Sequence, residues 1–316
     1  MYIGIDIGGR SIKIGIVNKE GKILYNDSTD TKVELGYEKV RDNLIELIDN
    51  TFIFAKEKDY KIKSIGIGVP GISDPKSDYI VYATNLKWNN VPLGKDLKVK
   101  YNIPIYIDND ATVAGIAESV SGVTKGCTNS IFVTLGTGVG GGLIINDKVY
   151  SGSHNKGSEI GHMIVGENFY DCNCGNNGCL ETFASATAID KYTQKLIDEG
   201  CKDEEFMKAL KLRNYIIDTK LIFDLAKKGN KLALKSVNRM TDYLAIGLAN
   251  LINLLNPDII AIGGGVSKAG EYLIKKLEEK VINYVIFKEG KTTEIKLSKL
   301  GNDAGIIGAA LISEYK

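Results

Sequence analysis

The sequence lacks an excess of charge of either sign and lacks any long apolar run. Its 316 residues include 40 Lys and Arg against 39 Asp and Glu, so the net charge is +1. This balance gives no electrostatic reason to expect a nucleic-acid partner. Asp6 and Arg10 interrupt any apolar segment near the first residue, so we expect no secretory signal, and no stretch is long enough to span a membrane. We therefore expect a cytoplasmic protein with no nucleic-acid or membrane partner.

Histidine and cysteine are also scarce, with two and five residues respectively, yet four of these seven fall in one segment. The four are His162, Cys172, Cys174 and Cys179. Three thiolates and one imidazole complete the closed tetrahedral shell that a structural Zn²⁺ takes. A chance cluster of thiols is the alternative, because the cysteine spacing is looser than that of zinc-ribbon pairs. Disulfides are less expected, because three clustered cysteines leave one over and nothing indicates export.

Two glutamates, Glu159 and Glu181, lie at the two edges of this segment. A bound metal would fix both side chains in space. Fixed carboxylates accept hydrogen bonds from the hydroxyl groups of sugars. The alternative is that both are solvated surface charges, which is the usual state of a glutamate.

Familiar nucleotide motifs are missing as well. No glycine turn runs into Gly-Lys-Ser/Thr, and none fits Gly-x-Gly-x-x-Gly with a later acid. Glycine turns nevertheless follow three predicted strands, at Gly8, at Gly136 and at Gly263. A strand, a glycine turn and a second strand can press backbone amides against a phosphate, although a single such turn is also typical of a plain hairpin.

Predicted strands alternate with predicted helices along the chain, which favours an α/β protein. Asp110 stands between the strand at 103–107 and the helix at 111–120, where it is either a plain helix N-cap or a functional acid. The other predicted strands cover residues 2–7, 13–17, 22–28, 63–69, 130–135, 143–145, 148–150, 259–262 and 294–297. The other helical patterns cover residues 37–58, 184–228, 231–255, 270–284 and 304–313.

The segment from residue 157 to 181 resembles the signature of the ROK family of bacterial-type glucokinases, related sugar kinases and sugar-responsive repressors. It reads Glu-Ile-Gly-His and then Cys-x-Cys-Gly-x-x-Gly-Cys-x-Glu. The resemblance extends from Asp6 to Ala310. It implies two ribonuclease-H-like domains of the actin-like ATPase and sugar kinase superfold, around a cleft, with a zinc-binding loop insertion. We expect one domain at 1–112 plus 302–316 and the other at 113–301.

The resemblance implies ATP-dependent phosphorylation of a hexose at its 6-hydroxyl group, with glucose as the favoured substrate. Kinases for N-acetylglucosamine, N-acetylmannosamine or fructose share the same motifs and are alternatives, as is a non-catalytic sugar sensor. Repressors of the family carry an N-terminal helix-turn-helix, for which a strand beginning at Tyr2 leaves no room. The implied cofactors are ATP, Mg²⁺ and structural Zn²⁺, and relatives suggest a homo-oligomer, a dimer or a tetramer.

The resemblance also assigns roles to residues. Asp110 is the base that takes the proton of the attacking hydroxyl, and His162 serves both the metal and the sugar through its two ring nitrogens. The implied sugar-binding residues are Gly71, Asn85, Asn109, Asp110, Glu159, His162 and Glu181. The implied ATP and Mg²⁺ residues are Asp6, Gly8, Gly9, Arg10, Gly136, Thr137, Gly138, Gly263, Gly264 and Gly265.

Arg10 departs from the family pattern, which has threonine at this position. One interpretation is that the guanidinium holds the ATP phosphates through its fork of donors. A second is that Arg10 points into solvent while Ser11 or backbone amides serve the phosphate. A third is that its bulk weakens ATP binding. We favour the first, because a cation beside a polyphosphate is stabilised at short range.

Overall fold

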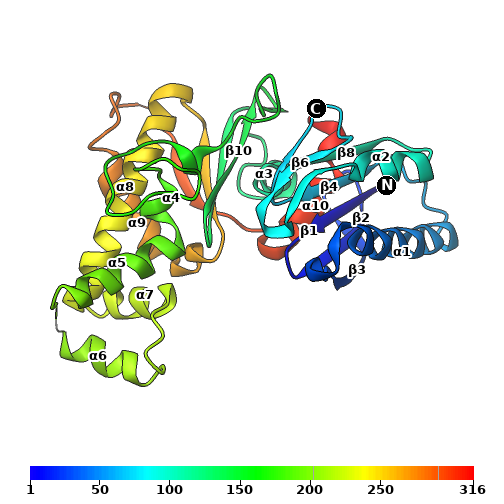
Figure 1. The fold of residues 1–316 in the computed structure, drawn as a ribbon. Coiled ribbons are helices and arrows are strands. Elements are labelled where there is room, and N and C mark those ends of the chain that lie inside the picture. Colours follow the sequence, from blue (N-terminus) through cyan, green and yellow to red (C-terminus); the bar gives the residue numbers. More distant parts are fainter. Residues whose placement is uncertain (202, 291) are drawn as a thin grey trace. The chain divides into compact units, whose positions relative to one another are not determined.

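The computed structural model describes residues 1–201, 203–290 and 292–316, and this part of the chain forms two compact units (Figure 1). The first unit contains Met1–Phe132, Gly142–Ser158 and Lys299–Lys316, and the second contains Val133–Gly141 and Glu159–Ser298. The predicted helix at 111–120 lies wholly in the first unit, although the predicted domain boundary at residue 112 would cut it. The predicted domain boundaries remain a prediction.

The first unit is built on a mixed five-stranded sheet of order β3-β2-β1-β4-β8. A second, three-stranded sheet has the order β5-β6-β7. The strands are β1 (Tyr2–Ile7), β2 (Ser11–Val17), β3 (Ile23–Asp30), β4 (Ile65–Val69), β5 (Ile72–Ser73), β6 (Ile80–Ala83), β7 (Trp88–Val91) and β8 (Ile105–Asn109). The helices are α1 (Gly36–Glu57), α2 (Leu93–Lys100), α3 (Asp110–Ser121) and α10 (Ala304–Ala310).

In the five-stranded sheet of the first unit, large apolar residues alternate with smaller or polar ones along β1, and this alternation determines which residues lie on each face. On β1, Ile3, Ile5 and Ile7 are fully buried in the core that also contains the apolar face of α1. Successive strand residues point to opposite faces, so Gly4 faces the other side, where α10 packs. A Cβ at Gly4 would lie 1.9 Å from the carbonyl oxygen of Ile306, so only glycine permits this close approach.

A second five-stranded sheet has the order β11-β10-β9-β12-β13, and the division into units falls inside β9 and β10. Its strands are β9 (Ser130–Leu135), β10 (Val139–Ile145), β11 (Lys148–Val149), β12 (Ile259–Gly263) and β13 (Glu294–Leu297). The helices of the second unit are α4 (Glu181–Ala184), α5 (Ala186–Asp198), α6 (Glu204–Lys211), α7 (Thr219–Lys227), α8 (Lys231–Leu255) and α9 (Glu271–Val281).

The helical pattern predicted over residues 184–228 is divided into short helices, and side-chain caps explain where they begin. Ser185, Asp203 and Asp218 accept hydrogen bonds from the backbone N–H groups of the first turns of α5, α6 and α7. Such caps satisfy donors that a helix start leaves without partners. The strand at 130–135 and the helix at 231–255 coincide with β9 and α8. The small sheet and α2 were not predicted. Among the described residues, no helix is both long and apolar enough to cross a membrane.

Candidate active site

The glycine turn between β1 and β2 is held by the backbone and by Thr31. Gly8 N donates to Ser11 O at 2.9 Å, and the Thr31 hydroxyl donates to Gly8 O at 2.6 Å. Thr31 N also donates to Arg10 O at 3.0 Å, while Arg10 is exposed. The turn is therefore fixed without any use of the Arg10 side chain. Thr31 was not singled out in the sequence, because it lies beyond β3 and no local pattern links it to the turn.

Asp6 lies on β1 beside this turn, in surroundings that disfavour its charge. Burial raises the pKa of the Asp6 carboxyl, and Lys13, its register partner on β2, offsets this only in part. Helix α10 packs closely here, since a Cβ at Gly305 would lie 2.6 Å from Cγ of Asp6. A carboxylate in such a site is stabilised by a nearby cation.

Asn109, not Asp110, supplies the cap of α3. The Asn109 Oδ1 atom accepts hydrogen bonds from Ala111 N at 2.8 Å and Thr112 N at 3.4 Å. Asp110 is the first residue of the helix, is exposed, and accepts from Ala111 N at 2.8 Å. Capping therefore does not account for the acid at position 110. The positive end of the helix dipole stabilises its carboxylate.

Two predicted sugar-binding residues, Asn109 and Asn85, lie beside glycines of the predicted site. Asn109 Nδ2 donates to Gly71 O at 3.2 Å. A Cβ at Gly71 would lie 2.3 Å from Tyr82 O, so glycine is required there by chain packing as well. Asn85 is exposed, and a Cβ at Gly9 would lie 3.6 Å from its carbonyl oxygen. Gly9 is thus beside Asn85, and Gly71 beside Asn109.

In the second unit, the carboxylate of Glu181 lies against the backbone of the second glycine turn. Its Oε2 accepts a hydrogen bond from Val139 N at 2.9 Å. A Cβ at Gly138 would lie only 2.3 Å from the same oxygen. Further along the turn, Ala186 N donates to Gly136 O and the Thr187 hydroxyl donates to Thr137 O, both at 2.8 Å. The turn is therefore joined to α4 and α5.

The third glycine turn packs on the strand that leads into the second. Gly264 has a φ of 84°, and a Cβ there would lie 2.4 Å from Leu135 O. This left-handed conformation and close contact both require glycine. The Ser267 hydroxyl donates to Gly264 O at 2.7 Å. Gly263 is buried on β12, and Gly264 and Gly265 are exposed.

The four predicted metal ligands converge. One ligand atom from each of His162, Cys172, Cys174 and Cys179 lies within 4.8 Å of all the others. Cys174 Sγ is 3.5 Å from Cys179 Sγ, and Cys172 Sγ is 3.7 Å from His162 Nδ1. Ligands about 2.0–2.3 Å from a tetrahedral Zn²⁺ lie roughly 3.5–3.8 Å apart, so the geometry fits zinc. Burial raises the pKa of the thiols of Cys172 and Cys179, and a bound cation would favour their thiolates.

Asparagines that the sequence analysis did not single out brace this cysteine loop. Asn168 N donates to Asn177 Oδ1 at 2.8 Å, and Asn177 Nδ2 returns a bond to Asn168 O at 3.0 Å. Asn168 Nδ2 in turn donates to Thr182 O at 2.8 Å. The Asn-Asn-Gly turn at 176–178 was the available signal, although it does not reveal the partner at position 168.

Glu159 and His162 flank the short turn Ile160–His162. His162 N donates to Glu159 O at 3.0 Å. A Cβ at Gly161 would lie 2.1 Å from Val139 O, so the turn packs tightly on the start of β10. Glu159 is exposed, yet neighbouring protein atoms partly desolvate its carboxyl group and raise its pKa. His162 opposes this shift and Glu181 adds to it, so the three predicted side chains share one electrostatic environment.

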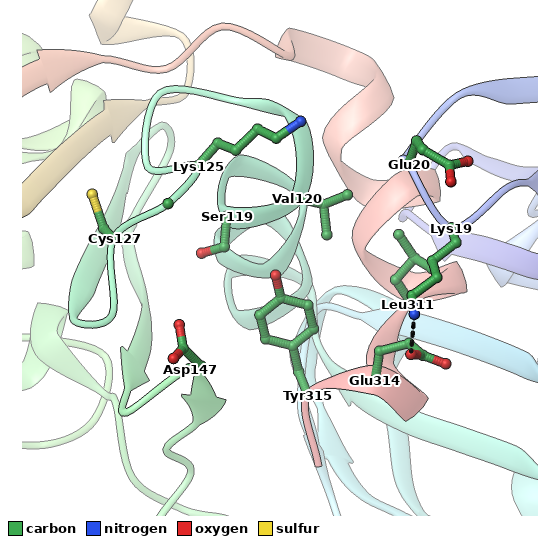
Figure 2. A pocket seen from close by; sticks show the side chains of 11 residues that line it. Lys19, Glu20, Ser119, Val120, Lys125, Cys127, Asp147, Leu311, Glu314 and Tyr315 are labelled. Carbon is green, nitrogen blue, oxygen red and sulfur yellow. Dashed lines mark ion pairs between the residues drawn. The ribbon is translucent and has the colours of Figure 1, made fainter.

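A cavity of about 510 Å³ lies elsewhere in the first unit (Figure 2). It is lined by the turn after β2, by Ser119 and Val120 near the end of α3, and by Tyr315, among others. None of the predicted site residues lines it. Asp110 begins α3, so at about 1.5 Å per residue the cavity is roughly one and a half nanometres along the helix from the predicted base.

Comparison with known proteins places these features in a family. The ROK family model matches residues 2–315. A glucokinase of Thermotoga maritima is 37% identical in an alignment that covers 98% of this chain and 96% of the relative. A xylose repressor of Caldicellulosiruptor bescii is 34% identical over 99% of this chain and 78% of its own length. The crystal structure of a ROK family glucokinase from Streptomyces griseus, in complex with glucose and AMPPNP, matches with a TM-score of 0.78 at 30% identity, over 98% of this chain and 97% of that one.

Proposed function

The chain belongs to the ROK family, and we propose that it transfers the γ-phosphoryl group of ATP to the 6-hydroxyl group of a hexose, with glucose as the favoured substrate. A relative named glucokinase aligns over nearly the full length of both chains. A solved relative with the same fold binds glucose together with an ATP analogue. Both observations support a kinase whose substrates are a sugar and ATP.

The observation that carries the proposal is that Asn109 caps α3, whereas Asp110 is the first residue of that helix and is exposed. Phosphoryl transfer requires little covalent work from a protein beyond positioning, charge neutralisation and a group to take the hydroxyl proton. The Asn109 side chain caps α3 and also donates a hydrogen bond to Gly71 O. Asp110 is therefore not needed as the cap. Asp110 has the exposure and the position at a helix N-terminus that suit a general base.

The remaining predicted residues receive roles in the same proposal. Asn85 and Glu159 would bind sugar hydroxyl groups, as would Glu181 and the ring nitrogen of His162 that faces away from Cys172. Asp6 would hold Mg²⁺ through water, because Mg²⁺ keeps much of its hydration shell and would stabilise a desolvated carboxylate. The turns at Gly8, Gly136 and Gly264 would offer backbone to the nucleotide.

Zinc has a structural role in this proposal. With four protein ligands its coordination is complete, so no position is left for a substrate. It would hold the loop between His162 and Cys179, whose two edges carry Glu159 and Glu181. The same proposal includes assembly into a homo-oligomer, a dimer or a tetramer, which light scattering of the purified chain tests.

The deciding experiment is a panel of sugars assayed with ATP and Mg²⁺ for ADP release. Glucose, mannose, fructose, N-acetylglucosamine and N-acetylmannosamine form the panel, and the Asp110→Asn variant controls for contaminating kinases. We expect the highest kcat/KM with glucose. Preference for an acetylated sugar or fructose would change the assigned substrate but keep the reaction. Tight sugar binding by calorimetry without ADP release from any sugar would make the protein a sensor and overturn the proposal.

A further inference from the structure

Arg239 on α8 is surrounded by aromatic side chains. The centre of its guanidinium group lies 4.4 Å from the ring of Tyr192, 4.7 Å from that of Phe183 and 5.3 Å from that of Tyr243. Phe169 lies at 5.7 Å. Each ring face attracts a cation electrostatically, and more strongly when both are desolvated. Four rings around one guanidinium group form a site that lysine could not fill in the same way.

No carboxylate among the described residues forms an ion pair with Arg239, although the side chain is half-buried. The nearby Asp242 pairs with Lys280 instead. Half-burying a cation without a carboxylate is costly unless other groups replace its hydration. The four rings and one hydrogen bond do so here, and that bond leads to the cysteine loop.

The hydrogen bond joins α8 to Asn168, and through Asn168 to Thr182, so that it reaches both sides of the three cysteines. Arg239 Nη2 donates to Asn168 Oδ1 at 2.7 Å, before the cysteines. Asn168 Nδ2 donates to Thr182 O at 2.8 Å, after them. Thr182 directly follows Glu181, and the next residue, Phe183, stacks on Tyr243 with ring centres 3.8 Å apart.

We propose that Arg239 is a positioning residue that holds the segment from Asn168 to Phe183 against α8 and thereby sets the place of Glu181 and of the three cysteine ligands of zinc. For Glu181 the proposal rests on the sugar-binding role proposed above. For the zinc ligands it rests only on the contacts of this chain. Arg239 acts through Asn168 and Phe183, and within the described part of the chain it forms no hydrogen bond or ion pair with a predicted metal ligand or with Glu181.

Arginine is specific to this role because it combines two functions. Its guanidinium carbon lies over the rings of Tyr192 and Phe183 while Nη2 reaches Asn168, which the point charge of lysine cannot reproduce. Arg239→Lys therefore keeps the charge and most of the volume but loses the directed hydrogen bond to Asn168. Asn168→Ala removes the other partner of the same bond. Arg213→Lys, at a partly exposed pair with Asp218 in the same unit, is the matched control.

The test combines kinetics with two measurements that need no substrate. We expect Arg239→Lys to raise the sugar KM about 5- to 10-fold, the loss expected from one ordinary hydrogen bond, with less than about a twofold change in the ATP KM. Zinc should pass to a chromophoric chelator several-fold faster, and amides of residues 168–183 should exchange faster. Asn168→Ala should reproduce these effects, and the double variant should add little to them. Arg213→Lys should change none of them.

A lower melting temperature with unchanged sugar KM, zinc release and amide exchange would show that Arg239 only adds stability, and would overturn the proposal. So would additive effects in the double variant. If no sugar is phosphorylated, the proposed function fails, but zinc release still tests the positioning role. If the purified protein holds no zinc, amide exchange over residues 168–183 decides whether Arg239 positions the loop.

Discussion

The side-chain amine of Lys316 lies 3.3 Å from Oδ2 of Asp108. Asp108 is 3% exposed and immediately precedes Asn109 and Asp110. Its Oδ1 accepts a hydrogen bond from Asn109 N at 2.8 Å, whereas its Oδ2 has no hydrogen-bond partner within the described part of the chain, so the ion pair is what compensates Oδ2. Lys316 also donates to Ile107 O at 3.3 Å. The end of β8, which carries the predicted base, is thus held by a lysine from the far end of the sequence.

Lys316→Met should therefore destabilise the protein. A fully buried ion pair that loses one partner costs about 3–5 kcal/mol and an exposed pair about 0–1, and this pair joins a buried to a partly exposed group. We expect the free energy of unfolding to fall by about 2 kcal/mol in denaturant titrations. Lys95→Met, at an exposed lysine of α2, is the control. Asp108→Asn combined with Lys316→Met should recover part of the loss, and equal stability of wild type and Lys316→Met would contradict the importance of the pair.

Asp110→Asn tests the base. Asparagine has nearly the same shape and can still accept the bond from Ala111 N, so the melting temperature should change little. Turnover should fall by at least ~10²-fold, the range for losing a general base. Asp59→Asn, an exposed acid in the turn after α1, should leave turnover unchanged. Near-normal turnover of a folded Asp110→Asn enzyme would remove this residue from the mechanism.

Purified protein should contain about one zinc per chain, because four ligands in one shell hold one ion. Cys174→Ala should lose the metal and weaken sugar binding, measured by elemental analysis and calorimetry. The variant replaces an exposed ligand, so the buried Cys172 and Cys179 keep their packing. Cys201→Ala, outside the cluster, should retain zinc. Absence of zinc from the wild type, or sugar affinity that survives chelation, would show that the site is misassigned.

Arg10→Ala should raise the KM for ATP several-fold with little change in the sugar KM. The Arg10 backbone is held by Thr31 and its side chain is exposed, so the substitution should not disturb the turn. Arg10→Thr should retain activity, because threonine is usual in the family at this position. Lys22→Ala, at an exposed lysine in the turn between β2 and β3, is the control for charge alone. An unchanged ATP KM in Arg10→Ala would place the side chain in solvent.

Asp6 should make stability depend on pH. Its pKa is raised in the folded protein from a reference value of 3.8, so folding favours the protonated form. That contribution is complete below the unfolded pKa and is lost as pH rises through the folded pKa. Asp6→Asn should therefore melt higher than the wild type at about pH 7 and similarly at about pH 4, while its Mg²⁺-dependent activity falls. Thermal melts of both proteins across this pH range test the prediction. A lower melting temperature of Asp6→Asn than of the wild type at about pH 7 would refute it.

The local sequence determined several features of this protein by itself. Ile3, Ile5 and Ile7 alternate with smaller or polar residues, and that period of two sets the faces of a strand without help from the rest of the chain. His162 and the three cysteines lie close enough along the chain for one loop to bring them together. Their chemistry predicts a zinc site, although the spacing alone left a chance cluster of thiols as the alternative. The glycine turns could also be predicted, because each one directly follows its strand in the sequence.

Tertiary structure decided which neighbour each of these residues meets. Asn109 rather than Asp110 caps α3, because chain geometry at the end of β8 turns the amide back toward the helix. Gly71 and Gly138 are glycines partly because Tyr82 O and the Glu181 carboxylate occupy the space of a Cβ. Lys316 reaches Asp108, and Arg239 reaches Asn168 across 71 positions. Such pairs arise from packing between distant segments, for which the sequence carries no periodic signal.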